Sequence, residues 1–484
     1  CSVIPVGKRV TAKPGTALLK WRSSPRIYAV DMVGANGKPI LHHVSTETIA
    51  IALYGSLWNR GYWSNPVGVL RWLPDVQLTD YEIGAALTGA EQYSPASVRQ
   101  AADIEAVLGI SAPPAPTPPP SGGSVGITDP YRAVARSSFP LPAFNVSVTE
   151  PDFGTTLRRI GNATSGNIDR HIYSQLQAFN SDSSLMMVYQ GPNGNADTVI
   201  KNVLTGQNVR TLPSDINSPR WNPANGDEVI FFDDNADTVL RIQKMNIRTG
   251  TRSTVATLAG YQRVSPAVSF EELSRDGRWL ALVADNDNFV AYNIAENRFG
   301  ARLTRGSGVL TGTGCSATDN SPNWVGVSPG GRYMDIQWNR DGSGACEGVQ
   351  VFDIETGAYA GHVADNRQHS DKGIDENGND VYVSPYFGSS LLLAVTRYPG
   401  SINFADRYDK VILDTGWEHI DHISCQGTNG ICVITGGGTA SEPFGDEAYL
   451  VYTSGSAADN GQNNNAKVRR LAHIRSTTSD YFHQ

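Results

Sequence analysis

A short pattern that occurs six times along the chain constrains the fold more than any other feature. Each copy has an apolar or aromatic residue, a small polar turn rich in Asp, Asn or Gly, and a run of alternating residues that favour strands. The copies occupy residues 179–189, 221–232, 273–283, 327–337, 374–383 and 424–434, with starts 42, 52, 54, 47 and 50 residues apart. A repeat of this length, built from short strands and turns, predicts the blades of a β-propeller.

The turn within each copy explains why the strands on either side of it should pair. Asp-Gly and Asn-Gly steps adopt the positive φ that a tight hairpin needs. Each copy is followed by a second pair of strands, as at residues 349–354 and 358–361. Because one four-stranded blade cannot bury both faces alone, neighbouring blades have to pack together. We therefore expect a mainly β protein.

Seven candidate outer strands stand against six sets of inner strands, so the sequence leaves the blade count open. The outer strands are predicted at residues 157–160, 208–211, 253–256, 298–301, 358–361, 410–413 and 468–471. Three arrangements fit: a seven-bladed propeller with an incomplete last blade, a six-bladed ring with a spare strand, and an incompletely closed ring that the N-terminal region or another subunit completes. We favour seven blades.

The composition supports a turn-rich β protein and argues against two classes of protein. Glycine (49) and proline (27) are abundant, and charged residues make up only 18% of the 484 residues, as expected for a chain with many turns. The net charge of −8 argues against a nucleic-acid-binding surface. No apolar run is long enough for a transmembrane helix.

Changes in composition divide the chain into a basic tether (1–24), a small α+β module (25–110), a Pro/Gly/Ser-rich linker (111–127) and the propeller (128–484). In the module, residues 27–30 and 40–44 are predicted to form a hairpin, and Ser45 is predicted to cap a helix that runs to Tyr54. The prolines of the linker favour the extended polyproline II conformation, so we expect a semi-rigid spacer.

The module also carries a set of residues that is similar to a small module of bacterial and archaeal surface proteins. The matching residues are Ser24-Pro25, Tyr28-Ala-Val30, Gly37, Leu53-Tyr-Gly55, Trp58, Leu73-Pro-Asp75, Leu78 and Tyr81-x-x-Gly84. The resemblance covers about 60 residues. It implies an extracellular setting and no particular chemistry.

The five cysteines indicate an oxidising compartment. Cys425 and Cys432 flank one tight turn, and Cys315 and Cys346 flank another hairpin, so two disulfides are predicted. Cys1 is left over. An N-terminal Cys followed by Ser resembles a processed bacterial lipoprotein, which implies a lipid on the thiol and anchoring at the cell surface; the alternative is that the sequence simply begins there.

Histidines near the starts of inner strands are the candidates for chemistry. His171, His369 and the pair His419/His422 fall at similar positions in three different repeats. Because innermost strands line the propeller axis, these side chains can meet there. His and carboxylate ligands suit Mn, Zn or Fe. A neighbouring His, Tyr or Arg could remove the proton next to a uronic-acid carboxylate.

The stretches that begin at His171, His369 and His422 resemble the blade starts of oligogalacturonate-lyase-type propellers and, more loosely, the propeller of the Tol system. This resemblance implies one divalent metal (Mn, Zn or Fe) held by His369, His419 and His422, with Gln368 as a fourth ligand. It also implies that His171 and Arg170 face the substrate. Tyr173 joins His171 and Arg170 as a candidate for proton transfer.

Two functions from different classes follow from these observations. The first is a surface-anchored extracellular or periplasmic propeller that binds or assembles glycan or protein partners, with a homo-oligomer or strand-completed assembly where a blade edge is open. The second is a metal-dependent polysaccharide (uronate) lyase. In the first case the histidines are hydrogen-bonded ties between blades. We favour binding, with contact to a membrane only through a lipidated N-terminus.

Overall fold

The computed structural model describes residues 12, 14–15, 17–21, 24–34, 36–54, 70–73, 75–95, 98, 126–173, 176–233, 239–265, 272–307, 310, 321–365, 369–387, 390–400, 408–416, 420–438, 440–458 and 462–475. The chain divides into two compact units, Cys1–Pro119 and Pro120–Gln484. This division falls inside the segment that the sequence predicts as a linker. Each unit is described by itself.

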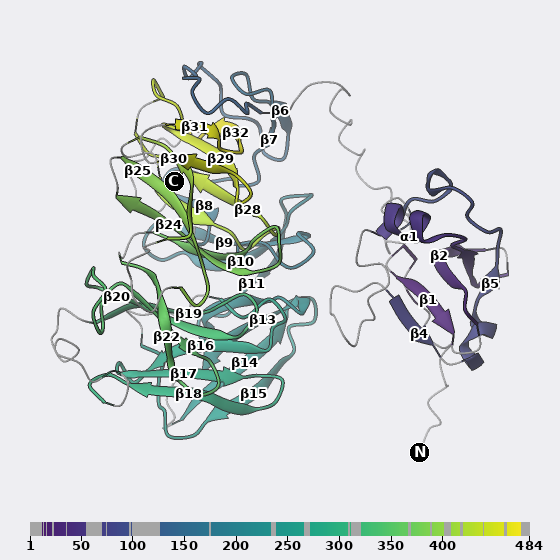
Figure 1. The fold of residues 1–484 in the computed structure, drawn as a ribbon, viewed down its shortest axis with the longest axis horizontal. Helices are drawn as coiled ribbons and strands as arrows, with labels where there is room; N and C mark the ends of the chain where they lie inside the picture. Colours follow the sequence, from purple (N-terminus) through teal and green to yellow (C-terminus); the bar gives the residue numbers. More distant parts are fainter. Residues whose placement is uncertain are drawn as a thin grey trace. The chain divides into compact units, whose positions relative to one another are not determined.

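The first unit is a five-stranded sheet with one short α-helix (Figure 1). The strand order is β4 (Leu70–Leu73), β1 (Leu18–Trp21), β2 (Ile27–Val33), β3 (Pro39–His43) and β5 (Glu82–Ile83); the helices are α1 (Glu47–Tyr54), η1 (Asp75–Asp80) and η2 (Ala90–Gln92). The predicted hairpin is confirmed, since β2 pairs antiparallel with β3. The sheet begins earlier than predicted, at Leu18, because β1 is buried against its neighbours.

The residue that caps α1 differs from the predicted one by a single position. Thr46 Oγ1 accepts the hydrogen of Ile49 N at 3.3 Å, as a capping side chain does. Ser45 Oγ instead donates to Leu87 O at 2.6 Å and ties the start of the helix to the following segment. A serine next to a threonine cannot be ranked as a cap without knowing which backbone groups lie nearby.

The second unit contains six consecutive antiparallel sheets of three or four strands among its described residues. In chain order they are β8 (Asn167–His171), β9 (Leu185–Pro192), β10 (Asp197–Asn202) and β11 (Asn208–Thr211); β12 (Asn217–Asn222), β13 (Asn225–Asp233), β14 (Leu240–Asn246) and β15 (Arg252–Leu258); β16 (Trp279–Ala284), β17 (Asn288–Asn293) and β18 (Arg298–Thr304). Then follow β19 (Pro322–Val327), β20 (Tyr333–Trp338), β21 (Val349–Asp353) and β22 (Tyr359–Ala364); β23 (Asp371–Ile374), β24 (Asp380–Phe387), β25 (Leu391–Arg397) and β26 (Lys410–Asp414); and β27 (His422–Ser424), β28 (Ile431–Thr435), β29 (Glu447–Tyr452) and β32 (Val468–His473).

A recurring turn connects the third and fourth strands of several sheets. In the fourth sheet, Asp353 Oδ1 accepts the hydrogen of Thr356 N at 2.9 Å, and Gly357 N donates to Asp353 O at 2.8 Å. Gly357 has φ +73°, in the region that favours glycine. The same arrangement occurs at residues 202–206 and 246–250. This local chemistry explains why the repeat could be read from the sequence.

Neighbouring sheets pack face to face through apolar side chains. Phe289 of the third sheet meets Trp338 of the fourth edge-on, with ring centroids 5.5 Å apart. One continuous apolar cluster extends from residue 230 to residue 354 and so crosses the second, third and fourth sheets. The core therefore lies between blades, and the prediction of a mainly β propeller architecture is confirmed.

The seventh predicted blade is not confirmed. Six of the seven predicted outer strands lie in β11, β15, β18, β22, β26 and β32. The remaining one, residues 157–160, overlaps β7 (Thr156–Arg158) instead. β7 forms a separate two-stranded sheet with β6 (Ser147–Thr149). Six sheets in the described part of the chain agree with the six-bladed alternative.

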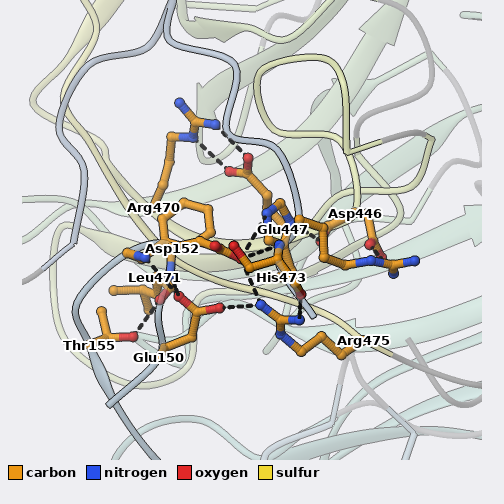
Figure 2. A network of polar contacts seen from close by, with 12 residues as sticks. Glu150, Asp152, Thr155, Asp446, Glu447, Arg470, Leu471, His473 and Arg475 are labelled. Atoms are coloured by element: carbon orange, nitrogen blue, oxygen red, sulfur yellow. Dashed lines mark hydrogen bonds and ion pairs between the residues drawn. The ribbon is translucent and has the colours of Figure 1, made fainter. Parts of the chain in front are cut away.

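Residues 126–160, called the bridging segment below, tie the last sheet to the first. Ile127 forms a bridge with Arg470 of β32, and Thr155 Oγ1 donates to Leu471 O at 2.5 Å. The fully buried Arg470 makes two hydrogen bonds to Glu447 (Figure 2). It also donates to the carbonyls of Asp129 and Arg132. The segment then leads directly into β8. It lies beside β32, at the yellow end of the chain in Figure 1.

One of the two predicted disulfides is confirmed: Cys425 and Cys432 are bonded across the turn between β27 and β28. Cys346 is also disulfide-bonded, while Cys315 and Cys1 lie outside the described residues. A small sheet of β30 (Ser456–Ala458) and β31 (Gln462–Asn465) completes the second unit. Within the described ranges, no helix is long and apolar enough to cross a membrane.

Candidate functional site

Side chains from four different sheets meet near the inner strands of the propeller. Tyr173 lies two residues after β8, Trp324 lies on β19, His369 lies two residues before β23, and His422 begins β27. All four come from the first strand of a sheet or from the residues next to it. These four residues are called the axial cluster below. Two further candidates, Gln368 and His419, lie outside the described residues.

The rings of the axial cluster are in direct contact. His369 and His422 stack with centroids 4.4 Å apart and planes inclined by 13°. Tyr173 meets His422 edge-on at 5.7 Å and Trp324 at 6.2 Å. The structure therefore brings together three of the candidate residues named from the sequence: Tyr173, His369 and His422. Trp324 was missed, although its position three residues before the repeat at 327 was visible in the sequence.

Burial keeps the imidazoles of this cluster neutral. Desolvation, together with the nearby His369 and His171, lowers the pKa of His422 to about 4. Burial also lowers the pKa of His369, against the opposing effect of its hydrogen bond to Asp421. His369 Nδ1 donates to Asp421 O at 2.5 Å. Because a carbonyl only accepts, the proton of the neutral ring lies on Nδ1 and its lone pair on Nε2.

The other two candidates from β8 differ in their surroundings. His171 is close enough to influence the pKa of His422, and its Nδ1 donates to Ile172 O at 2.5 Å. Arg170 lines a separate cleft together with residues of the bridging segment. His171 and Arg170 are neighbours in a strand, where successive side chains point to opposite faces. The expectation that both face one substrate is therefore not supported.

The arrangement of the described residues does not match a metal centre. They contain no group of three His, Cys, Asp or Glu side chains that could hold an ion. The lone pairs of His369 and His422 lie in ring planes that are nearly parallel and stacked. Two such lone pairs do not converge on one ion at the 2.0–2.1 Å that metal–imidazole bonds require. We therefore derive no chemical step through a metal.

Buried charged residues that the sequence analysis did not identify lie on or just before the inner strands: Arg220 on β12, Asp371 on β23, and Glu272 before the repeat at 273. Burial raises the pKa of Glu272 to about 7, although Arg220 and a hydrogen bond from Gln177 N (2.8 Å) oppose this. Burial likewise raises the pKa of Asp371 to about 7. Arg220 and Glu272 each stand immediately before the first residue of a repeat. A charge at that position of an inner strand is the signal that could have identified them.

No protein-family model and no curated protein sequence matches the chain. Solved structures resemble it at low identity. An oligogalacturonate lyase from Vibrio parahaemolyticus is 10% identical, with a TM-score of 0.45 over 70% of this chain and 88% of the lyase. An oligogalacturonate lyase in complex with manganese is 10% identical, with a TM-score of 0.47 over 71% and 88%. TolB from Acinetobacter baumannii is 15% identical, with a TM-score of 0.31 over 60% and 64%.

These are the two kinds of propeller that the blade starts resemble in sequence. At identities of 10–15% and TM-scores below 0.5, the likeness transfers no activity and no site residue to this chain, because one fold carries many functions. The manganese belongs to the lyase in which it is bound. The axial cluster has to be interpreted from its own geometry.

Proposed function

We propose that the protein is a binding module whose propeller holds a glycan at the axial cluster. The observation that supports this most strongly is the convergence of Tyr173, Trp324 and the stacked pair of His369 and His422 from four sheets. Aromatic and imidazole rings give a ligand apolar faces, and their N–H and O–H groups add directional hydrogen bonds. A rigid set of sheets holds such groups in place without an ordering cost on binding.

Two features favour a glycan over a charged ligand at this place. The imidazoles are neutral at physiological pH, since burial lowers the pKa of His422 to about 4. Trp324 Nε1 is buried and has no acceptor among the described residues. Buried polar groups nearly always have a hydrogen-bond partner. A sugar hydroxyl would supply that acceptor.

A glycan array followed by calorimetric titration tests this proposal. Tyr173→Ala should weaken binding of the best glycan by about 10-fold or more, since aromatic contacts contribute about 0.5–1.5 kcal/mol beyond the area that they bury. Trp324→Phe keeps an aromatic ring and removes the N–H donor together with part of the indole surface. Tyr131→Ala is the matched control, because Tyr131 is half exposed and bonds Asn464 instead.

The proposal would be refuted by either of two results. One is the absence of saturable binding to any glycan by the folded wild-type protein. The other is equal loss of affinity in Tyr173→Ala and the Tyr131→Ala control. A glycan that binds wild type and the control equally, and Tyr173→Ala at least 10-fold more weakly, supports it.

The second candidate is a metal-dependent uronate lyase, which the contact of Tyr173 with a neutral His422 favours. Elemental analysis of the purified protein decides it. About one Mn, Zn or Fe per chain that is lost in a His369→Ala/His422→Ala variant, together with unsaturated products from uronic-acid polymers, would establish the lyase. If the wild type contains no bound metal and still binds glycan, the lyase is excluded and the binding module is supported.

An extracellular or periplasmic location is part of the same proposal. The Cys425–Cys432 disulfide supports it, because such bonds persist in oxidising compartments. Anchoring through a lipid on Cys1 and a homo-oligomeric or strand-completed assembly remain proposals. Intact-mass analysis of membrane-extracted protein tests the anchor, and mass determination in solution tests the assembly.

A further inference from the structure

A cleft of about 990 Å³ lies between the bridging segment, β8 and the end of β32. Its lining includes residues 157–159 from one wall, residues 166–170 from another, and His473, Ile474 and Arg475 from the chain that leaves β32. The three walls therefore come from the first and last sheets and from the segment that joins them. None of Tyr173, Trp324, His369 and His422 is among the lining residues.

Four arginines line this cleft: Arg158, Arg159, Arg170 and Arg475; they define the arginine cleft. Arg158 donates to the carbonyls of Val203 and Leu204, and Arg159 donates to the carbonyls of Gly161 and Pro142. Within the described part of the chain, neither guanidinium forms an ion pair. Neutral carbonyls orient both groups and leave their charges without a carboxylate.

The carboxylates near the cleft are already engaged. Asp169 lines it but is buried and paired with Lys201 at 2.5 Å. Arg475 pairs with Glu150 and Asp152, each at 2.7 Å (Figure 2). Its guanidinium lies 5.0 Å from the ring centre of Phe139. Among the described residues, Arg475 is thus matched by carboxylates, whereas Arg158 and Arg159 are not, in a chain whose net charge is −8.

Apolar residues also line the cleft, including Phe139, Leu141, Leu157 and Ile168. We propose that the arginine cleft is a second binding site, for an organic ligand that carries two or more oxyanion groups. Arginine recognises carboxylate and phosphate in the same bidentate way. The cleft has the volume of a small-molecule site, so an organic body between the oxyanions fills it and an isolated inorganic ion does not. The two guanidinium groups that have no carboxylate partner in the described ranges, those of Arg158 and Arg159, select a ligand with at least two anionic groups.

The proposal is tested by calorimetric titration of the full chain with citrate, fructose 1,6-bisphosphate, acetate and inorganic phosphate at two salt concentrations. We expect saturable binding of at least one of the first two, at least 10-fold tighter than acetate or phosphate and weakened by salt. The tighter of citrate and the bisphosphate identifies carboxylate or phosphate as the preferred oxyanion. Arg159→Gln should weaken this binding by about 10-fold, the effect of one lost charged hydrogen bond.

Two further variants separate binding from folding. Ser165→Glu changes an exposed lining residue and adds a negative charge, so it should weaken binding while the melting temperature stays unchanged. Arg302→Gln is the matched control, because Arg302 is exposed on β18 and is not among the residues that line the cleft. Failure of citrate and the bisphosphate to bind, binding no tighter than that of inorganic phosphate, or equal effects of Arg159→Gln and Arg302→Gln would overturn the proposal. Loss of glycan binding at the axial cluster would not affect it.

Discussion

The axial cluster and the bridging-segment network place titratable groups in the interior in opposite ways. At the axis, the first strands of several sheets bring His369 and His422 against apolar neighbours, and burial lowers the pKa of both. At the bridging segment, Arg470 and Glu447 are completely buried and remain paired through two hydrogen bonds. In the first region burial favours the uncharged form of the histidines. In the second region the buried charges of Arg470 and Glu447 neutralise each other.

This difference separates the buried residues that stabilise the fold from those that are suited to binding a ligand. The remaining donors of Arg470 bond the carbonyls of Asp129 and Arg132. A buried pair that is satisfied in this way is held in one arrangement. A buried group that is held neutral by desolvation alone responds to any ligand that changes its surroundings. We therefore expect substitutions at the bridging segment to affect folding, and substitutions at the axis to affect titration and binding.

The largest effect is expected when the compensated pair is broken. Arg470→Met leaves Glu447 buried without its partner and should cost about 3–5 kcal/mol in the free energy of unfolding, measured by urea denaturation. Arg252→Met, which breaks the partly exposed pair with Asp215, is the control and should cost no more than about 1 kcal/mol. Equal losses in both variants would show that the bridging segment does not secure the last sheet.

The next effect concerns the buried acid Glu272. Because burial raises the pKa of Glu272 from 4.5 to about 7, its contribution to stability is full below pH 4.5 and is lost as the pH rises through 7. This loss amounts to about 3 kcal/mol at 1.36 kcal/mol per pKa unit. Glu272→Gln should therefore flatten the decrease of unfolding free energy between pH 4.5 and 7. Parallel curves for wild type and variant would contradict a neutral Glu272.

The stacked histidines provide a test with the opposite pH sign. Burial lowers the pKa of His422 from 6.5 to about 4, so its contribution to stability is present above pH 6.5 and is lost as the pH falls through 4. His369→Ala removes the neighbouring ring and admits water, which should move the pKa of His422 towards 6.5. Titration of the imidazole resonances by NMR measures this. A pKa that stays near 4 would mean that other neighbours hold the ring neutral.

The smallest effect is expected at the rim of the bridging segment. Arg136 pairs with Asp446 at 2.6 Å, but its side chain is half exposed. Arg136→Ala should lower the free energy of unfolding by about 0.2–1 kcal/mol, and less at high salt, because solvent and ions screen exposed pairs. A loss as large as that of Arg470→Met would show that exposure does not separate the two pairs.

The structural features that could be predicted are those that depend on a short segment of the chain. The repeat at 327–337 and its Asp353–Gly357 turn follow from local hydrogen bonds, and the Cys425–Cys432 bond spans one turn. The meeting of His369 with His422 also followed from the sequence, because equivalent positions in repeats return to the same place around the axis. The prediction of an outer blade strand at residues 157–160 was wrong, because a short strand has the same sequence pattern in a blade as in the two-stranded sheet of β6 and β7.

By itself, the sequence determined a mainly β propeller of repeated sheets, a separate smaller unit before it, and the histidines that gather at the axis. These follow from periodicity and turn chemistry, which act over a few residues. Only the tertiary structure decided that Arg470 joins Glu447 to residues 126–160 and that four arginines share one cleft. Such contacts join residues more than 300 positions apart in the sequence. A local sequence pattern cannot predict which of these side chains will come into contact.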